Sequence, residues 1–114
     1  MSECPFCGIA SGKIKSDVVY SDERLVAFKD LNPAAPVHVL IIPRKHIATL
    51  NDLADSDADL MGRVLLAAKK IAADKGIAEP GYRIVINCNK DAGQAVGHIH
   101  FHLLGGRHLG WPPG

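Results

Sequence analysis

One segment alternates histidines with apolar residues so regularly that it constrains how the rest of the chain can fold. In residues 98–103 a histidine stands at every second position, and Ile99, Phe101 and Leu103 follow the histidines one by one. Side chains of a β-strand point alternately to opposite faces, so the pattern predicts a strand with three imidazoles on one face and an apolar face in the core. Neighbouring imidazoles on that face are rooted about 6.6 Å apart, a spacing that lets them flank one phosphate or one ion. We therefore interpret the histidine face as functional.

The other apolar patterns predict further strands and one long helix around this segment. Val, Ile, Leu and aromatic residues gather in four more short segments with turn-like residues between them, which is typical of strands with short connections. From near residue 55 to Gly76, apolar residues recur at i, i+4 spacing, which predicts an amphipathic helix of about 20 residues, roughly 30 Å long. We expect the α+β class, with a five-stranded antiparallel sheet, one long helix and a short N-terminal helix. The expected strands are residues 17–20, 25–29, 37–42, 82–87 and 98–104, and the short helix is residues 6–11.

Length and charge exclude several classes of protein. The 114 residues fit one compact domain, which we expect to span residues 1–114. With 13 basic and 12 acidic residues the formal net charge is +1, so the chain lacks the positive field that drives binding to duplex nucleic acid or anionic membranes. Its apolar runs are far shorter than the roughly 20 residues of a membrane span. The first residues lack the pattern of a secretory signal, so we expect a cytoplasmic protein.

Two of the three cysteines form a C-x-x-C motif near the start of the chain. Cys4 and Cys7 have the spacing of half a zinc site or of a redox centre, and no second C-x-x-C motif completes a four-cysteine site. Histidines would have to supply the remaining ligands. The strand that precedes C-x-x-C in thioredoxin-like proteins has no counterpart before Cys4, so we favour metal binding over redox chemistry. We interpret Cys88 as an ordinary thiol.

A glycine-containing loop lies just before the histidine-rich segment. Gly93, Gln94 and Gly97 would let backbone N–H groups approach an anion closely, as at a phosphate site. Glycines in such a loop also serve turn geometry alone, and both interpretations stay open on the residues. Neither G-x-x-x-x-G-K-[ST] nor G-x-G-x-x-G occurs, so a phosphate would be held by histidines and backbone groups.

Residues 93–104 resemble the signature of the histidine-triad (HIT) family, in which H-x-H-x-H is followed by two apolar residues. The resemblance covers nearly the whole chain and includes residues 27–30, 36–43 and 45–47. The ending Trp111-Pro112-Pro113-Gly114 is similar to the branch of histidine-triad nucleotide-binding proteins that hydrolyse purine nucleoside phosphoramidates. The resemblance implies the fold of that family. It also implies a symmetric homodimer that pairs the fourth strand and the helix of each subunit.

For the reaction, the resemblance implies two steps at the α-phosphorus of a nucleotide. His100 would attack phosphorus to give a nucleotidyl-histidine, and water would then release the nucleoside monophosphate. His102 would contact the phosphoryl oxygens and assist proton transfer, and His38 would face the triad from the third strand. Neither magnesium nor an organic cofactor is implied. The expected substrate-binding residues are Asp30 at the ribose hydroxyls, Phe6, Ile9, Ile14, Phe28 and Leu31 around base and sugar, Asn87, Gly93, Gln94 and the Ala95 backbone at the phosphate, and Trp111 reaching toward the site of the partner subunit.

The resemblance also bears on the C-x-x-C motif. Some histidine-triad proteins complete this cysteine pair with the histidine after the third strand and the first histidine of the triad. That comparison implies a structural zinc ion held by Cys4, Cys7, His46 and His98. On this interpretation His98 ties the catalytic strand to the start of the chain.

This sequence departs from the family pattern next to the triad. Where the phosphoramidate-hydrolysing branch usually reads Gly-Gln-Ser-Val, this chain has Ala95 in place of the serine. Gly97 stands before the triad, where an aromatic residue is common. A serine hydroxyl can donate a hydrogen bond to the leaving nitrogen or relay a proton, and a methyl group can do neither. We therefore expect substrates with poor leaving groups to react more slowly in this protein.

Two other functions stay open from the sequence. A nucleotide-sensing or partner-binding module, in which turnover is incidental, would need the same pocket and the same phosphate cradle. A poly-histidine metal enzyme would use all three triad imidazoles as ligands and would lose its activity with a chelator. Metal content, and turnover in the presence of a chelator, discriminate between these functions and the hydrolase.

Overall fold

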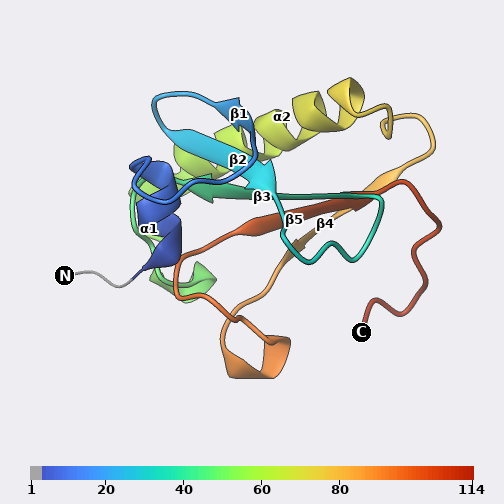
Figure 1. Ribbon diagram of the computed structural model, residues 1–114. Helices are drawn as coiled ribbons and strands as arrows, with labels where there is room; N and C mark the ends of the chain where they lie inside the picture. The colour runs from blue at the N-terminus through green and yellow to red at the C-terminus, as the bar shows by residue number, and fades with distance from the viewer. Residues whose placement is uncertain (1–3) are drawn as a thin grey trace.

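Two helices flank a five-stranded antiparallel sheet in the computed structural model, which describes residues 4–114 (Figure 1). The strands lie in the order β1-β2-β3-β5-β4, and each neighbouring pair is antiparallel. The fold class predicted from the sequence is confirmed. In this part of the chain no helix has the length and apolar character needed to cross a membrane. The elements are α1 (Pro5–Ala10), β1 (Val18–Ser21), β2 (Leu25–Lys29), β3 (Val37–Pro43), the 3-10 turns η1 (Leu50–Asp52) and η2 (Asp55–Asp57), α2 (Ala58–Asp74), β4 (Tyr82–Ile86), η3 (Lys90–Ala92) and β5 (Phe101–Gly105).

The long helix α2 covers one face of the sheet. Its buried residues include Leu60, Val64 and Ile71, which recur at helical spacing. They form one core cluster with apolar residues of every strand. Ile99, Phe101 and Leu103, which alternate with the three histidines, belong to this cluster. The prediction that the residues between the histidines face the helix is therefore confirmed. Because those side chains point to α2, the imidazoles point away from it.

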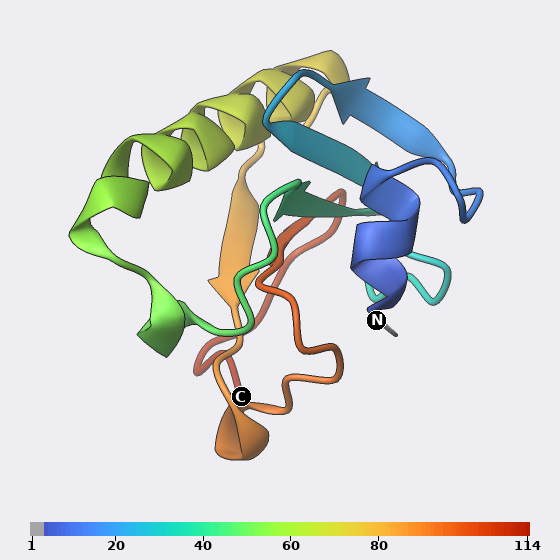
Figure 2. The same ribbon diagram turned by 90° about the vertical axis from the view of Figure 1, so that its left-hand side faces the viewer.

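The short helix α1 lies on the opposite face of the sheet from α2 (Figure 2). Phe6 is the buried residue of this helix and packs with Val26, Phe28, Leu40 and Ile42 in a second apolar cluster. Pro5 stands in its first turn, where a missing N–H costs nothing. The imidazole face is thus not open sheet, because part of it is covered by α1.

The triad strand begins later than predicted. β5 starts at Phe101, so the residues before it, including two of the three histidines, lie outside the sheet ladder. Continuing the β3–β5 register beyond the pair Ile41–Phe101 would set Ile99 opposite Pro43, which has no N–H to donate. Ile99 donates its own N–H to the carbonyl of Ile47 instead, at 2.7 Å. Proline at the end of β3 therefore accounts for the difference.

The start of the long helix also differs from the prediction. The residues around 55 form the turn η2, and α2 begins only at Ala58. The carboxylate of Asp57 accepts the N–H of Ala54 at 2.9 Å and pairs with Nζ of Lys45 at 2.6 Å. These two contacts hold the chain in a tighter turn before the helix. The other predicted bounds, those of α1, β1, β3 and β4, differ from the observed ones by one residue.

Candidate functional site

His100 lies just before β5, with its ring held by a backbone carbonyl. Its Nδ1 is 2.8 Å from the carbonyl oxygen of His98. A carbonyl oxygen only accepts hydrogen bonds, so Nδ1 carries the proton and Nε2 of the neutral ring keeps its lone pair. The residue is 6 % exposed, and the ring of Phe6 meets its ring at a steep angle with the centres 5.1 Å apart. In its neutral form, His100 thus presents the lone pair of Nε2 in a fixed orientation, as an imidazole nucleophile must.

A second pair of imidazoles lies beside His100 on the same face of the sheet. His38 on β3 and His102 on β5 are diagonal neighbours across the antiparallel ladder. Nε2 of His38 is 2.9 Å from Nδ1 of His102 and 3.4 Å from a carboxylate oxygen of Asp30. The ring centres of His100 and His102 are 5.0 Å apart. The structure therefore brings His38 and Asp30 together with the last two histidines of the triad.

A backbone N–H, together with the nearby carboxylate of Asp30, indicates which nitrogens of this pair carry protons. The N–H of Ala34, in the loop before β3, donates to Nδ1 of His38 at 3.0 Å. A neutral imidazole has one N–H, so the proton of His38 is on Nε2 and is donated to Nδ1 of His102. His102 then carries its own proton on Nε2. His100 and His102 consequently differ in character, since one has a bare Nε2 and the other has an Nε2–H donor.

Burial keeps both members of this pair neutral near pH 7. It lowers the pKa of His102 to about 4, and the charges of His100 and His38 act in the same direction against the opposing effect of Asp30. Burial also lowers the pKa of His38 below its usual value, again against the carboxylate of Asp30. Each ring therefore has a single proton, and the hydrogen bonds described above decide where it sits.

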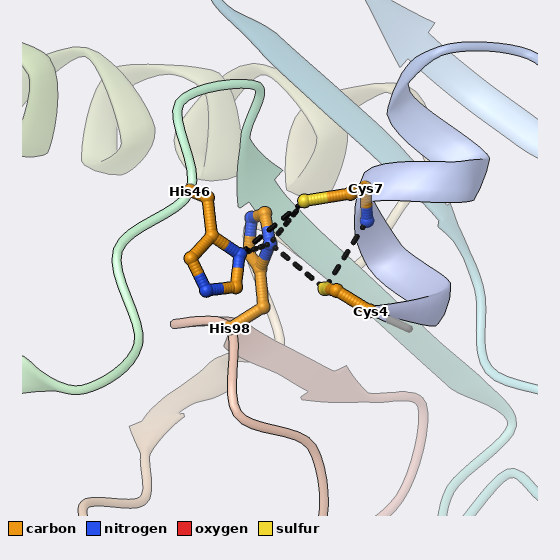
Figure 3. Close-up of side chains that lie close together, drawn as sticks. All are labelled: Cys4, Cys7, His46 and His98. Carbon is orange, nitrogen blue, oxygen red and sulfur yellow. Dashed lines mark hydrogen bonds between the residues drawn. The ribbon is translucent and has the colours of Figure 1, made fainter. Parts of the chain in front are cut away.

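A separate cluster of four side chains lies at the N-terminal end of α1 (Figure 3). Nδ1 of His98 is 3.4 Å from Sγ of Cys4 and 3.6 Å from Sγ of Cys7. Nδ1 of His46 is 3.3 Å from Sγ of Cys7 and 3.2 Å from Nδ1 of His98. Zinc bonds of about 2.3 Å to sulfur and 2.0 Å to nitrogen, in a tetrahedron, set sulfur–nitrogen and nitrogen–nitrogen separations of about 3.5 and 3.3 Å. The spacing and the donor atoms are those of a two-cysteine, two-histidine site.

Hydrogen bonds from outside the cluster orient its members. His98 is fully buried, and its Nε2 donates to the carbonyl oxygen of Pro43 at 2.8 Å, which leaves a lone pair on the Nδ1 that faces the cysteines. The backbone N–H of Cys7 donates to Sγ of Cys4 at 3.3 Å. Burial lowers the pKa of His98, whereas burial and the neighbouring Cys4 raise the pKa of the Cys7 thiol. A bound cation is what would favour the thiolate form of this pair.

The loop before the triad is held by the side chain of Gln94. Its Oε1 accepts the N–H of Asn89 at 2.8 Å, and its Nε2 donates to the carbonyl of Ala48 at 2.8 Å. Gly93 has φ of 79°, and the N–H groups of Gly93 and Gln94 both donate to carbonyls within the turn. The two N–H groups that we expected at the phosphate are thus occupied in this structure, and turn geometry accounts for the glycine. Among the described residues nothing bonds the N–H of Ala95, which stays free for a phosphate.

The residues expected around base and sugar divide into buried and exposed groups. Phe6 and Phe28 meet edge to face with ring centres 5.5 Å apart, and Ile9 packs against their cluster. One carboxylate oxygen of Asp30 accepts the N–H of Asn32 at 2.8 Å, which orients it at the end of β2. Asn87 follows β4 and is half-buried. The exposed group consists of Ile14, Leu31 and Trp111, whose exposed fractions in the single chain are 45, 91 and 81 %.

Sequence reasoning did not identify which backbone groups orient the imidazoles. The carbonyl of His98, the carbonyl of Pro43 and the N–H of Ala34 each determine which nitrogen of an imidazole is protonated. Every residue offers similar backbone groups, so no residue type in the sequence marks these three positions. Only the fold shows which of them meet a ring nitrogen.

The fold, together with the histidines gathered at and before the start of β5, defines a histidine-triad protein. Residues 11–109 match the HIT domain family, and the chain belongs to this family. The resemblance noted in the sequence is thereby confirmed.

Similar proteins are found in several bacteria. The purine nucleoside phosphoramidase of Escherichia coli strain K12 is 49 % identical over 108 residues, which cover 95 % of this chain and 91 % of that protein. A crystal structure of a HIT family hydrolase from Legionella pneumophila Philadelphia 1 is 54 % identical, with a TM-score of 0.97 over 98 % of this chain and 100 % of that one. A histidine triad protein from Clostridium difficile is 44 % identical, with a TM-score of 0.94 over 96 % of each chain.

Proposed function

We propose that this protein hydrolyses purine nucleoside phosphoramidates through a nucleotidyl intermediate on His100. The observation that carries the proposal is the hydrogen bond from Nδ1 of His100 to the carbonyl of His98, which leaves Nε2 with a lone pair. The substrate class is supported by the E. coli relative, which is named a purine nucleoside phosphoramidase and is 49 % identical. The intermediate is supported by the burial and orientation of this imidazole, whose Nε2 is the nitrogen available to attack in the neutral ring.

Two imidazoles have defined roles in this reaction. First, the lone pair on Nε2 of His100 forms a bond to the α-phosphorus, and the phosphorus–nitrogen bond to the leaving amine breaks. The departing nitrogen keeps the electron pair of that bond and takes a proton from water. The resulting hydroxide then attacks phosphorus, and the bond to His100 breaks with its electron pair returning to Nε2. In both steps the Nε2–H of His102 donates to a phosphoryl oxygen, where it stabilises the developing charge.

The nucleoside would lie between Asp30 and the aromatic residues near α1. The carboxylate of Asp30 is 19 % exposed and keeps acceptor capacity for the ribose hydroxyls. The free N–H of Ala95 would meet the phosphate together with His102. Phe6 closes this face of the sheet next to His100 and limits the access of water to it.

We further propose that Cys4, Cys7, His46 and His98 hold a structural zinc ion. The residues fit the metal, because two thiols and two ring nitrogens lie within 4.8 Å of one another with orienting hydrogen bonds behind them. When bound, zinc would supply cross-linking rather than reaction chemistry, since it would tie α1 to the chain after β3 and to the chain before β5. The triad imidazoles do not share one ion on this assignment, because each takes a different partner.

A homodimer is proposed from the family and from the free edge of the sheet. β4 is an edge strand, and next to it the tail is held by Arg83, which donates to the carbonyl of Gly110 at 2.9 Å and lies 5.9 Å from the ring centre of Trp111. On α2, Leu65 and Leu66 are exposed apolar residues available to a second copy. Light scattering at micromolar concentration tests this proposal. A monomer would overturn both the dimer and the role of Trp111 at a partner's site.

The proposed activity is tested with adenosine 5′-phosphoramidate. We expect purified protein to release adenosine monophosphate, and rapid quenching to trap an adenylyl group on the chain at His100. The His108→Ala variant is the matched control, because His108 is an exposed histidine outside the site. Binding of adenosine monophosphate without any turnover would favour the nucleotide-binding module instead. Turnover that a chelator abolishes and added metal restores would favour the metal enzyme.

A further inference from the structure

The chain that leaves β5 closes on the loop that precedes β3. Gly106 has φ of 93°, and a Cβ atom there would lie 2.8 Å from Cβ of Pro36, so glycine is needed for this close approach. The next residue, Arg107, donates from Nε and Nη2 to the carbonyl oxygen of Ala34, at 3.2 and 2.9 Å. Its Nη1 donates to the carbonyl of His108 at 2.9 Å. The guanidinium group therefore connects the C-terminal segment with the loop at Ala34.

Ala34 is also the residue whose N–H sets the protonation of His38. It lies between β2 and β3, where the chain has no regular secondary structure, so no ladder hydrogen bond fixes its position. In the described part of the chain, the carbonyl of Ala34 is bonded by Arg107. Two N–H groups of one planar guanidinium on one carbonyl restrain that carbonyl more strongly than a single ammonium group does.

We propose that Arg107 is a positioning residue that keeps the proton of His102 on Nε2. By holding Ala34 in place, Arg107 keeps the N–H of Ala34 on Nδ1 of His38. The proton of His38 then stays on Nε2, Nδ1 of His102 stays an acceptor, and Nε2 of His102 stays a donor. Arg107 acts through these contacts and touches none of the reacting atoms. Its effect on turnover rests on the proposed function, whereas its effect on the imidazoles does not.

Without this restraint the direction of the hydrogen bond between the two imidazoles can reverse. If the N–H of Ala34 moves away, only the 3.4 Å contact with the carboxylate of Asp30 still favours a proton on Nε2 of His38. The form in which His38 carries its proton on Nδ1 and accepts on Nε2 then becomes populated. His102 then donates from Nδ1, and its Nε2 becomes a bare nitrogen. A bare nitrogen repels a phosphoryl oxygen instead of donating to it, so the loss falls on the transition state.

The protonation of the two rings can be read directly from the ¹⁵N resonances of the histidines. The informative variants are Arg107→Gln and Arg107→Lys, and Arg24→Gln is the control. Arg24 pairs at 2.7 Å with Asp59 on the protein surface, so the control removes one equal charge and one arginine contact elsewhere. If Arg107→Gln fails to fold, Arg107→Lys carries the same test, since its single ammonium group retains the charge without the bidentate contact.

We expect the wild type and Arg24→Gln to show the Nε2–H form of His102. In Arg107→Gln the two ring nitrogens of His102 should move toward each other as both forms become populated, with a smaller shift in Arg107→Lys. His100 should keep its Nδ1–H form in every variant. An unchanged His102 in both Arg107 variants would overturn the proposal, and so would an equal change at His100, because that would indicate general loosening.

Kinetics provide the second part of the test. Loss of one oriented donor to the phosphoryl group should lower kcat of Arg107→Gln by about tenfold or more, with KM within about twofold of wild type. A higher KM at unchanged kcat would contradict a role in the chemical step. If the wild type releases no adenosine monophosphate at all, the proposed function fails, and the ¹⁵N spectra still decide the role of Arg107.

Discussion

The carbonyl oxygen of His98 accepts the Nδ1–H of His100 at 2.8 Å, while the ring of the same His98 faces the two cysteines. That ring is fixed on both sides, because its Nε2 also donates to Pro43 at 2.8 Å. One residue therefore joins the proposed zinc site to the proposed nucleophile. A displacement of the His98 backbone would therefore disturb both the ring that faces the cysteines and the carbonyl that orients His100.

Replacing the nucleophile should remove turnover and spare binding. His100→Ala deletes the nitrogen that would attack phosphorus but leaves Asp30 and His102 in place. We expect affinity for adenosine monophosphate to stay within roughly tenfold, about 1.4 kcal/mol, and turnover to be lost. Titration calorimetry and product release measure the two quantities. Substantial turnover in His100→Ala, together with its loss in His102→Ala, would assign the nucleophile to His102.

Metal analysis tests the cluster at the start of α1. We expect one zinc ion per chain in protein purified without added metal or chelator, and a lower melting temperature after chelation, because the ion ties three parts of the chain together. Cys7→Ser should lose the metal. Cys88→Ser is the matched control, since Cys88 is a half-buried thiol outside the cluster, and it should keep the metal. Substoichiometric metal with unchanged melting after chelation contradicts the assignment.

Ala95 should limit the turnover of substrates that have poor leaving groups. Ala95→Ser restores a hydroxyl that can donate to the departing nitrogen, next to an N–H that is already free for the phosphate. We expect turnover of an alkylamine phosphoramidate to rise more than turnover of a substrate with an acidic, easily expelled group. Steady-state rates on the two substrates measure this difference. Equal effects on both would show that Ala95 has little catalytic meaning.

Acid should weaken the fold through His102. The pKa of this ring is about 4 in the folded protein against an ordinary value of 6.5, so between these pH values the unfolded chain binds more protons. The contribution to the free energy of unfolding is complete above about pH 6.5, declines as the pH falls and is lost below about pH 4. In His102→Gln the dependence should be shallower across this window. Urea unfolding of both proteins measures it, and equal slopes would rule out this origin.

The sequence predicted the sheet and helix well because both rest on periodic patterns. The alternation after His98 correctly predicted that Phe101 and Leu103 face the helix, and the i, i+4 apolar pattern correctly predicted the long helix α2. The start of β5 was wrong because it depends on which residue stands opposite, and Pro43 lies more than fifty positions away. Local patterns carry no information about such pairings.

The grouping of the site residues was predicted from the family resemblance, whereas their protonation was not predicted. Histidines and cysteines are recognisable as donors wherever they occur, but residue type alone does not show which of them meet in the fold. Which ring nitrogen is protonated depends on the backbone groups of Ala34, Pro43 and His98. The hydrogen bonds from the N–H groups of Gly93 and Gln94 to carbonyls of the turn were not predictable either, because they depend on the fold.

The late start of β5 places the proposed nucleophile at a boundary of local stability. From Phe101 onward the strand has β3 on one side and β4 on the other, so its amides should exchange with solvent deuterium only when the sheet opens. The residues just before it lie outside the ladder but are buried, and Ile99 donates its N–H to the carbonyl of Ile47. The segment that carries His100 is therefore protected by burial and by contacts outside the sheet ladder. Its amides should report the packing around the site separately from the opening of the sheet.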